Sequence, residues 1–310
     1  MRVYRNVQSV APEHTGAVVA VGNFDGVHSG HRVVIGEAGK IATAAGLKWG
    51  VLTFEPHPRN VFQPDIPPFR ITPFADKARH IRDLGVDFMI AQKFDMEYSG
   101  QSAATFVEQS LVQALSVRHL VAGYDFKFGH KRQGSCETLL AMGNAHGFDF
   151  TVVSAASDDG GGLYSSTRAR ELLGKGDVRA VSEILGRPFE ITGMVNHGDA
   201  RGRTIGFPTA NIALRQYIHP AFGVYAVYLT LPDGRVISGV ANLGLRPTVA
   251  GNTAPRLEVH LFDFEGDIYG HKVSVQFVEM LRAEKKFDGL DALKAQIARD
   301  SEQARAIHNI

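Results

Sequence analysis

The first half of the chain alternates short apolar runs with longer amphipathic segments. Five runs have the length and composition of buried strands, at residues 17–24, 50–54, 86–94, 119–126 and 148–156. Helical patterns separate them, at residues 29–45, 74–84, 102–115 and 135–146. One face of the first helix is expected to carry Val33, Val34, Ile41 and Ala45. Gly85 is expected to end the second helix. The alternation predicts a parallel, doubly wound sheet, whose ligands bind beyond the carboxyl ends of the strands.

The pattern changes in the second half of the chain. Two short helices are expected at residues 167–173 and 177–185. Period-two strands bounded by Gly and Pro follow, at residues 225–231, 235–242, 256–264 and 271–281. Such strands predict a small antiparallel barrel, and an amphipathic helix at residues 290–307 is expected to pack on it. We therefore place the domain boundary near Leu185, giving domains at residues 1–185 and 186–310.

Composition narrows the function classes. The 310 residues suffice for two domains with separate cores, and a net charge of +1 gives no bias toward nucleic acid or acidic membranes. The N-terminus lacks a secretion signal, and no stretch approaches the ~18 apolar residues of a membrane helix. We predict a cytoplasmic protein that binds small molecules, neither nucleic acid nor membrane, as a monomer or weak homo-oligomer. Cys136 is the only cysteine, so no internal disulfide forms, and we interpret it as an ordinary thiol.

A glycine-rich turn with two histidines follows the first predicted strand. In GNFDGVHSGH, residues 22–31, Gly22 and Gly26 allow a tight turn and close approach of a ligand. His28 and His31 can face one side of the following helix start, whose N–H groups suit phosphate. Two imidazoles there can stabilise the charge that develops on a polyphosphate. A lone histidine would more often be a cap or surface residue, but the full H-x-G-H resembles the signature of the nucleotidyltransferase superfamily.

SSTRAR, residues 165–170, opens another predicted helix. Ser165 or Ser166 can simply be the helix N-cap, and Arg170 a solvated side chain. Alternatively, Ser166 and Thr167 contact phosphate while Arg170 neutralises the leaving pyrophosphate. Both interpretations can hold at once.

The first half of the chain contains four motifs in order, GNFDGVHSGH, TFEPHP, GYDFKFG and SSTRAR. Their order and spacing resemble the FMN adenylyltransferase domain of bacterial bifunctional riboflavin kinase/FAD synthetases. Ala169 departs from the larger aliphatic residue usual in the family, which should affect packing more than chemistry. The resemblance implies ATP or phosphate contacts from Gly22, Asn23 and Phe24. It also implies a flavin site, to which we assign Phe54, Pro56, Pro58 and Asp125. Phe62 is interpreted as core.

A second polar segment, residues 193–212, lies between predicted strands of the second half. Its glycines can bring N–H groups close to phosphate, although the segment does not match a Walker loop. Thr209 and Asn211 are hard oxygen donors on the same side of an extended strand. Such donors suit a Mg²⁺ that keeps water and substrate phosphate as its other ligands. On their own, these residues would more often be plain turn residues.

Glu258 lies in an alternating apolar strand, where a carboxylate must be paired, exposed or functional. Alternation puts Glu258, His260 and Phe262 on one side. We choose Glu258 as the base that takes a proton from an attacking hydroxyl. The alternative is a surface residue of an edge strand.

The second half of the chain resembles the riboflavin kinase domain, a six-stranded antiparallel barrel. The motifs that carry the resemblance are HGD–R–GFPTANI, GVYAV, GVANLGLRPT, LEVHLFDF, DIYG and LRAEKKF. The resemblance implies that Gly198 and Arg203 lie near ATP phosphate and that Thr209 and Asn211 lie near Mg²⁺. It makes Glu258 the base, and Arg282 with its following loop is expected to close over the flavin.

The resemblance covers about residues 15–305. It implies that residues 186–310 convert riboflavin and ATP to FMN and ADP, and that residues 1–185 convert FMN and a second ATP to FAD and pyrophosphate. Mg²⁺ would be the cofactor, ATP the co-substrate, and no covalent enzyme intermediate is expected.

Three alternatives stay open at this point. Another nucleotidyltransferase, acting on phosphopantetheine or glycerol phosphate, fits the first motif but not GYDFKFG or the second half. A flavin-binding sensor without catalysis is disfavoured by the intact H-x-G-H, PTAN and Glu258. Nucleic-acid binding through FKFGHKR, residues 126–132, is less expected than an active-site loop at this net charge.

Overall fold

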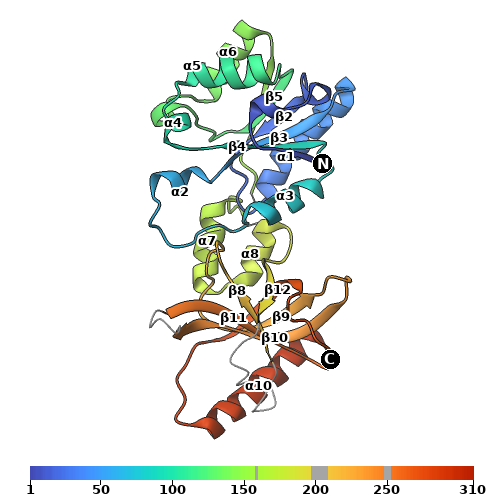
Figure 1. Ribbon diagram of the computed structural model, residues 1–310, viewed down its shortest axis with the longest axis vertical. Coiled ribbons are helices and arrows are strands. Elements are labelled where there is room, and N and C mark those ends of the chain that lie inside the picture. The colour runs from blue at the N-terminus through green and yellow to red at the C-terminus, as the bar shows by residue number, and fades with distance from the viewer. Residues whose placement is uncertain (158–159, 197–208, 248–252) are drawn as a thin grey trace. The chain divides into compact units, whose positions relative to one another are not determined.

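A computed structural model describes residues 1–157, 160–196, 209–247 and 253–310 (Figure 1). By contacts the chain forms two compact units, Met1–Pro67 with Thr72–Ser165, and Pro68–Ile71 with Ser166–Ile310. Each is described by itself. The domain boundary near Leu185 stays a prediction.

The first unit is built on a six-stranded sheet in the order β1-β4-β3-β2-β5-β6, in which every pair is parallel. Its strands are β1 Arg2–Tyr4, β2 Val18–Val21, β3 Trp49–Glu55, β4 Phe88–Lys93, β5 His119–Gly123 and β6 Asp149–Val153. All five predicted strands are present. Only β1 was missed, because a three-residue edge strand is too short to show a period.

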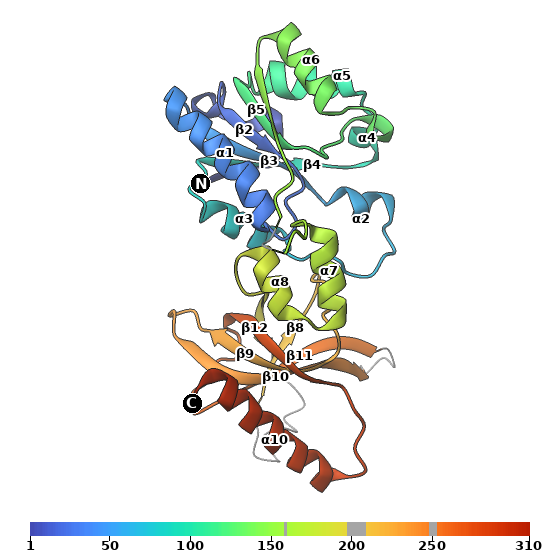
Figure 2. The same cartoon turned by 180° about the vertical axis from the view of Figure 1, so that it is seen from behind.

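Helices cover both faces of this sheet (Figure 2): α1 Ser29–Ala45 and α3 Phe74–Arg82 pack on one face, and α6 Cys136–His146 packs on the other. Three short helices, α2 Pro58–Phe62, α4 Met96–Ser99 and α5 Ala103–Thr105, bury none of their own residues. Strand alternation separates two cores. Val18 and Ala20 of β2 pack with α1 and α3, whereas Val19 and Val21 pack with α6 and the segment after α5. The predicted doubly wound sheet is thereby confirmed.

Two details of the helices differ from the prediction. The buried stripe of α1 is Val34, Ile35, Ala38 and Ala42, while Val33 and Ala45 are exposed. Residues four apart stay on one face of a helix, and Val33 falls outside that stripe. The helix expected at residues 102–115 continues from α5 as a π-helix over Phe106–Ala114.

The second unit contains a closed barrel in the order β10-β11-β8-β7-β12-β9 with only antiparallel pairs, which confirms the predicted barrel. Its strands are β7 Glu190–Asn196, β8 Ala210–Ala213, β9 Gly223–Thr230, β10 Val236–Pro247, β11 Thr253–Leu261 and β12 Lys272–Ala283. Helices α7 Ser166–Lys175 and α8 Val178–Leu185 precede it, and α10 Leu290–His308 follows.

The barrel buries one side of each strand inside and part of the other side under α10. Tyr225, Leu257 and Phe277 are among its fully buried residues. On the outer face, Val224 and Val240 pack with Ala304 of α10, as expected for a helix docked on the barrel. None of the described helices has both the length and the apolar character needed to cross a bilayer.

Candidate active sites

The H-x-G-H segment forms the turn between β2 and α1. His28 is the N-cap of α1, and its Nδ1 accepts a hydrogen bond of 3.2 Å from the backbone N–H of His31. In a neutral His28 the ring proton must therefore sit on Nε2, which makes Nε2 a donor. The rings of His28 and His31 stack with centroids 3.5 Å apart. His28 is buried and His31 half-buried, so the two predicted imidazoles do lie together at the helix start.

Gly30, between the two histidines, leaves room for this stacking. A Cβ at Gly30 would lie 3.2 Å from two ring atoms of His28 and 3.3 Å from Cβ of Tyr164. Few real Cβ contacts are that short, so a side chain here must displace the His28 ring or its neighbour. The motif therefore needs glycine at position 30, because a side chain there would collide with the His28 ring or with Tyr164.

Gly30→Ala is expected to lower the rate of FAD formation about tenfold, since a ring displaced by a few tenths of an ångström weakens its contact with the reacting phosphate. Steady-state assays of FAD formation measure the effect. Gly36→Ala in the same helix is the matched control, because its Cβ meets nothing within 4 Å. A Gly30→Ala protein with unchanged FAD formation would contradict the steric argument.

Backbone geometry of the turn is unusual for its residues. Phe24 and Val27 are left-handed, with φ of 50° and 42°, a region that costs bulky residues energy. Two hydrogen bonds to Thr72 hold the turn: the Thr72 N–H donates to Asp25 Oδ1 at 3.1 Å, and the Gly26 N–H donates to Thr72 Oγ1 at 2.8 Å. Sequence reasoning missed Thr72, which carries no motif of its own.

The residues assigned to flavin lie beyond the carboxyl ends of β3 and β5. Phe54 is buried, Pro56 and Asp125 are exposed, and Pro58 begins α2. Phe62 is 56% exposed, so its interpretation as core is wrong. The short helix α2 carries Phe62 to the surface, where it packs edge-on against Phe94, 5.9 Å between centroids.

Aromatic rings connect these positions. We call Phe62, Phe94, Phe54, Phe106, Phe128 and Phe126 the aromatic row, since successive centroids are 5.3 to 6.5 Å apart. Tyr98 joins it beside Phe54 and Phe94, and burial raises the pKa of its phenol to about 12, so it stays neutral. Phe54, Phe106 and Phe128 of this row are buried in the core, whereas Phe62, Phe94 and Phe126 keep part of their surface exposed. Exposed aromatic rings at strand ends suit a planar ring system. Phe94 and Phe126 are the last residues of two predicted strands, and this position was the signal available in the sequence.

Cys136 is buried at the start of α6. Its thiol contacts the carbonyl oxygens of Gly123 and Tyr124 at 3.6 Å each. Burial raises the pKa of the thiol, which keeps it protonated. This agrees with its interpretation as an ordinary thiol.

SSTRAR begins α7 in the second unit. Arg170 Nε donates to the Phe69 carbonyl at 3.0 Å, and its guanidinium lies 5.4 Å from the Phe69 ring centroid. Ala169 is fully buried, consistent with an effect on packing. Phosphate contacts by Ser166, Thr167 and Arg170 stay predictions.

A row of polar side chains crosses the outer face of the barrel. Glu258 of β11 is paired with Asn211 of β8 on one side and with Asn242 of β10 on the other, and Asn211 is also paired with Asn196 of β7. Directly paired residues share a face of the sheet. Leu257 and Val259 are fully buried, so Glu258 and His260 point to the opposite face, as predicted. We call Asn196, Asn211, Glu258 and Asn242 the polar row.

One of the two predicted metal ligands, Asn211, belongs to this row, and Thr209 lies two residues before it in the chain. Asn211 is 6% exposed, and its amide nitrogen donates to the Thr209 carbonyl at 3.3 Å. The other amide atom, Oδ1, is the one that can bind a cation. Oxygen donors next to a carboxylate fit a hard cation such as Mg²⁺. Asn242 and Asn196 were not singled out from the sequence, because the neighbours of Glu258 depend on strand order.

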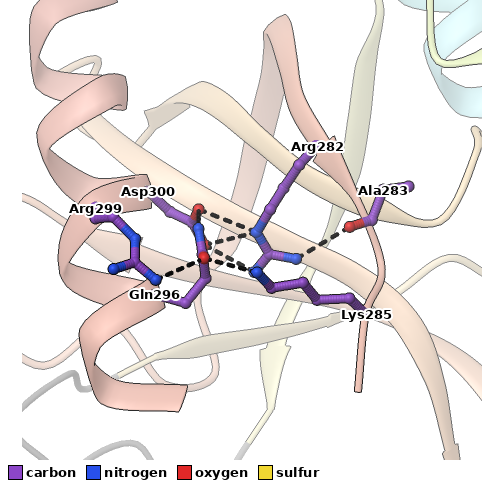
Figure 3. A network of polar contacts seen from close by, with 6 residues as sticks. All are labelled: Arg282, Ala283, Lys285, Gln296, Arg299 and Asp300. Atoms are coloured by element: carbon purple, nitrogen blue, oxygen red, sulfur yellow. Dashed lines mark hydrogen bonds and ion pairs between the residues drawn. The ribbon is translucent and has the colours of Figure 1, made fainter. Parts of the chain in front are cut away.

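Arg282, at the end of β12, is held by α10 (Figure 3). Its Nη2 and Nε bind the Asp300 carboxylate at 2.7 and 3.0 Å, and Gln296 donates to the same carboxylate at 2.7 Å. The Arg282 guanidinium also lies 5.6 Å from the Phe287 ring centroid. Its flavin contact stays a prediction. Gly198 and Arg203, predicted near ATP phosphate, lie outside the described residues.

Comparisons with known proteins match both halves of the chain. A family model described as FAD synthetase matches residues 10–168, and one described as riboflavin kinase matches residues 185–308. The bifunctional riboflavin kinase/FMN adenylyltransferase of Haemophilus influenzae is 42% identical over 309 residues, covering 100% of each chain. That of Escherichia coli strain K12 is 41% identical and covers 98% of this chain and 97% of its own.

A solved structure shares the fold over nearly the full length. The crystal structure of a Streptococcus pneumoniae protein described as a macrolide-efflux protein superposes with a TM-score of 0.86, at 32% identity and 98% coverage of both chains. With two family models in sequence and relatives aligned end to end, this chain belongs to the bifunctional riboflavin kinase/FMN adenylyltransferase family.

Proposed function

We propose that this chain makes FMN and then FAD. The barrel transfers the γ-phosphoryl group of ATP to the 5′-hydroxyl of riboflavin, and the N-terminal unit transfers the adenylyl group of a second ATP to FMN. The observation that carries the proposal is that each unit has its own polar site on the framework of its own family model: stacked imidazoles in one, a carboxylate beside amides in the other.

In the kinase reaction, Glu258 takes the proton of the riboflavin hydroxyl as it attacks phosphorus. Thr209 and Asn211 would hold Mg²⁺, which would neutralise charge on the transferring group. Asn242, on the other side of Glu258 in the polar row, is placed to orient the carboxylate or the hydroxyl.

In the adenylyl transfer, the nucleophile is the FMN phosphate, which is already ionised at neutral pH. No strong base is required, and catalysis is positioning plus charge stabilisation. His28 offers Nε2–H to the triphosphate, and the positive N-terminal end of the α1 dipole adds to the same field. The rings of the aromatic row that are not buried, Phe62, Phe94 and Phe126, are the part of it that can contact the flavin ring.

The remaining proposals concern the setting. We propose that the enzyme works in the cytoplasm, that its partners are riboflavin, FMN and ATP, and that it is a monomer or weak homo-oligomer.

Incubating the protein with riboflavin, ATP and Mg²⁺ is expected to give FMN first and FAD later, with ADP and pyrophosphate released. Replacing Mg²⁺ with excess EDTA is expected to stop FMN formation, because the ATP phosphates then lack their counter-ion. Chromatography of the flavins and nucleotides measures both. Flavin bound without turnover would favour the sensor alternative, and FMN formed at full rate in EDTA would contradict the metal proposal.

A further inference from the structure

Lys77 of α3 is fully buried in the first unit. A buried ammonium is costly unless polar partners surround it, so its partners indicate what it does. Its Nζ donates to the Asn23 carbonyl at 3.1 Å and to Thr53 Oγ1 at 3.2 Å. The Glu55 carboxylate lies 3.6 Å away and supplies a counter-charge.

These partners come from two strand ends that flank the adenylylation site. Asn23 lies in the turn between β2 and His28, whereas Thr53 and Glu55 end β3. Thr53 Oγ1 also donates to the Asn23 carbonyl, at 3.1 Å. The Asn23 carbonyl therefore accepts two hydrogen bonds, which fix the peptide just before the left-handed Phe24.

Besides Thr72, Lys77 is a second residue that holds this turn by hydrogen bonds. Thr72, shortly before α3, binds Asp25 and Gly26, and Lys77 binds Asn23. The segment from Thr72 to Lys77 thus holds three residues of the turn that carries His28, namely Asn23, Asp25 and Gly26. Two left-handed non-glycine residues persist there only if the surroundings hold them.

The burial of Lys77 also limits its role. With none of its side chain exposed, the ammonium is covered by protein and has no surface with which to touch a ligand. It can act on the reaction only through the groups it holds.

We propose that Lys77 is a positioning residue for adenylyl transfer, which fixes the Asn23 peptide and through it the turn that presents His28 and His31. The inference rests on the proposed function of this site. Replacing the ammonium with an apolar group leaves Asn23 with the single hydrogen bond from Thr53. A misplacement of about 1 Å can cost about 10²-fold in rate, so the loss should appear in kcat.

The test uses full-length Lys77→Met, which keeps the length of the side chain without the charge. We expect kcat for FAD formation from FMN and ATP to fall about 10- to 100-fold, with a much smaller change in KM. FMN formation from riboflavin should be unchanged, and the thermal midpoint should show a folded protein at the assay temperature. Lys40→Met, which removes an exposed charge on α1, is the matched control and should match the wild type.

Thr53→Val gives a second arm, because it removes the other hydrogen bond to the Asn23 carbonyl and with it one of the two oxygens to which Lys77 donates. Alone it should lower kcat for FAD formation several-fold, and with Lys77→Met the combined loss should differ from the product of the single losses. If Lys77→Met fails to fold, kcat for FAD formation by Thr53→Val alone tests the proposal.

A folded Lys77→Met or Thr53→Val protein with wild-type kcat for FAD formation would overturn the proposal. So would a loss in kcat that FMN formation shares. A wild-type protein that makes no FAD would instead overturn the proposed function, and this inference with it.

Discussion

His28→Ala combined with His31→Ala is expected to lower FAD formation from FMN by at least about 10³-fold, while FMN formation from riboflavin is unchanged. The two rings stack at the start of α1 and lie in one unit, whereas the polar row lies in the other. Removing one preorganised donor of this type typically costs about 10²- to 10³-fold, and this change removes two. Separate assays of the two products, from supplied riboflavin and from supplied FMN, measure the effect.

The control must separate chemistry from helix capping, because His28 is also the N-cap of α1. Losing a cap costs about 1 kcal/mol, enough to loosen the turn. His28→Asn keeps a good N-cap and removes the imidazole, so it should still lose FAD formation. His146→Ala, an exposed histidine at the end of α6, should have no effect. Retained FAD formation in the double variant, or loss of both products by a folded protein, would refute the division of labour.

Much of the fold is visible in local patterns. The strands of the parallel sheet are continuous apolar runs because both of their faces are buried, and such runs stand out from their surroundings. The barrel strands alternate, and the bounds of α1 follow from its polar start and from Gly46, which ends it in a left-handed conformation. The buried face of α1 was less predictable, since Val33 and Val34 are equally apolar and only the position of the sheet selects between them.

The parts of the sites that escaped prediction depend on contacts between distant residues. In the sequence, Lys77 looks like an ordinary solvated residue of a helix. No neighbouring residue in the sequence indicates that Lys77 is buried against the ends of β2 and β3, where it donates to Asn23 and Thr53. Thr72 binds a turn 46 residues earlier in the chain. Asn242 becomes a neighbour of Glu258 only when β10 pairs with β11. Short motifs therefore identified the reacting groups, while the residues that hold them needed the strand order.

Among the sequence-predicted residues, the structure brings two pairs together, His28 with His31 and Glu258 with Asn211. The first pair is explained by a local rule, the spacing at a helix start. In the second, alternation sets the face of each residue, and the pairing of β8 with β11 brings the two residues together. Arg282 shows the limit of such rules. Its position at the end of a strand could be predicted from the sequence, but its carboxylate partner comes from α10, 18 residues away.

Glu258→Gln is expected to lower FMN formation about 10²- to 10⁴-fold, the usual contribution of a positioned general base. Glutamine keeps the shape of the side chain in the polar row beside Asn211 and removes only the basic oxygen. Burst or single-turnover measurements with riboflavin and ATP should place the loss in the chemical step, with little change in KM. FAD formation from supplied FMN should be unchanged.

Glu265→Gln, an exposed carboxylate shortly after β11, is the matched control and should leave both products unchanged.

The two site variants also test each other. Because FMN released by one protein is the substrate of the other, a mixture of Glu258→Gln with the double histidine variant should convert riboflavin to FAD although neither protein does so alone. The double histidine variant would supply FMN and Glu258→Gln would adenylylate it. Failure of the mixture, with each remaining activity intact in separate assays, would mean that FMN does not pass between chains. FMN formation by Glu258→Gln at the wild-type rate would leave the proton of the riboflavin hydroxyl to another group, and in the polar row the neighbours of Glu258 are amides, which are not bases.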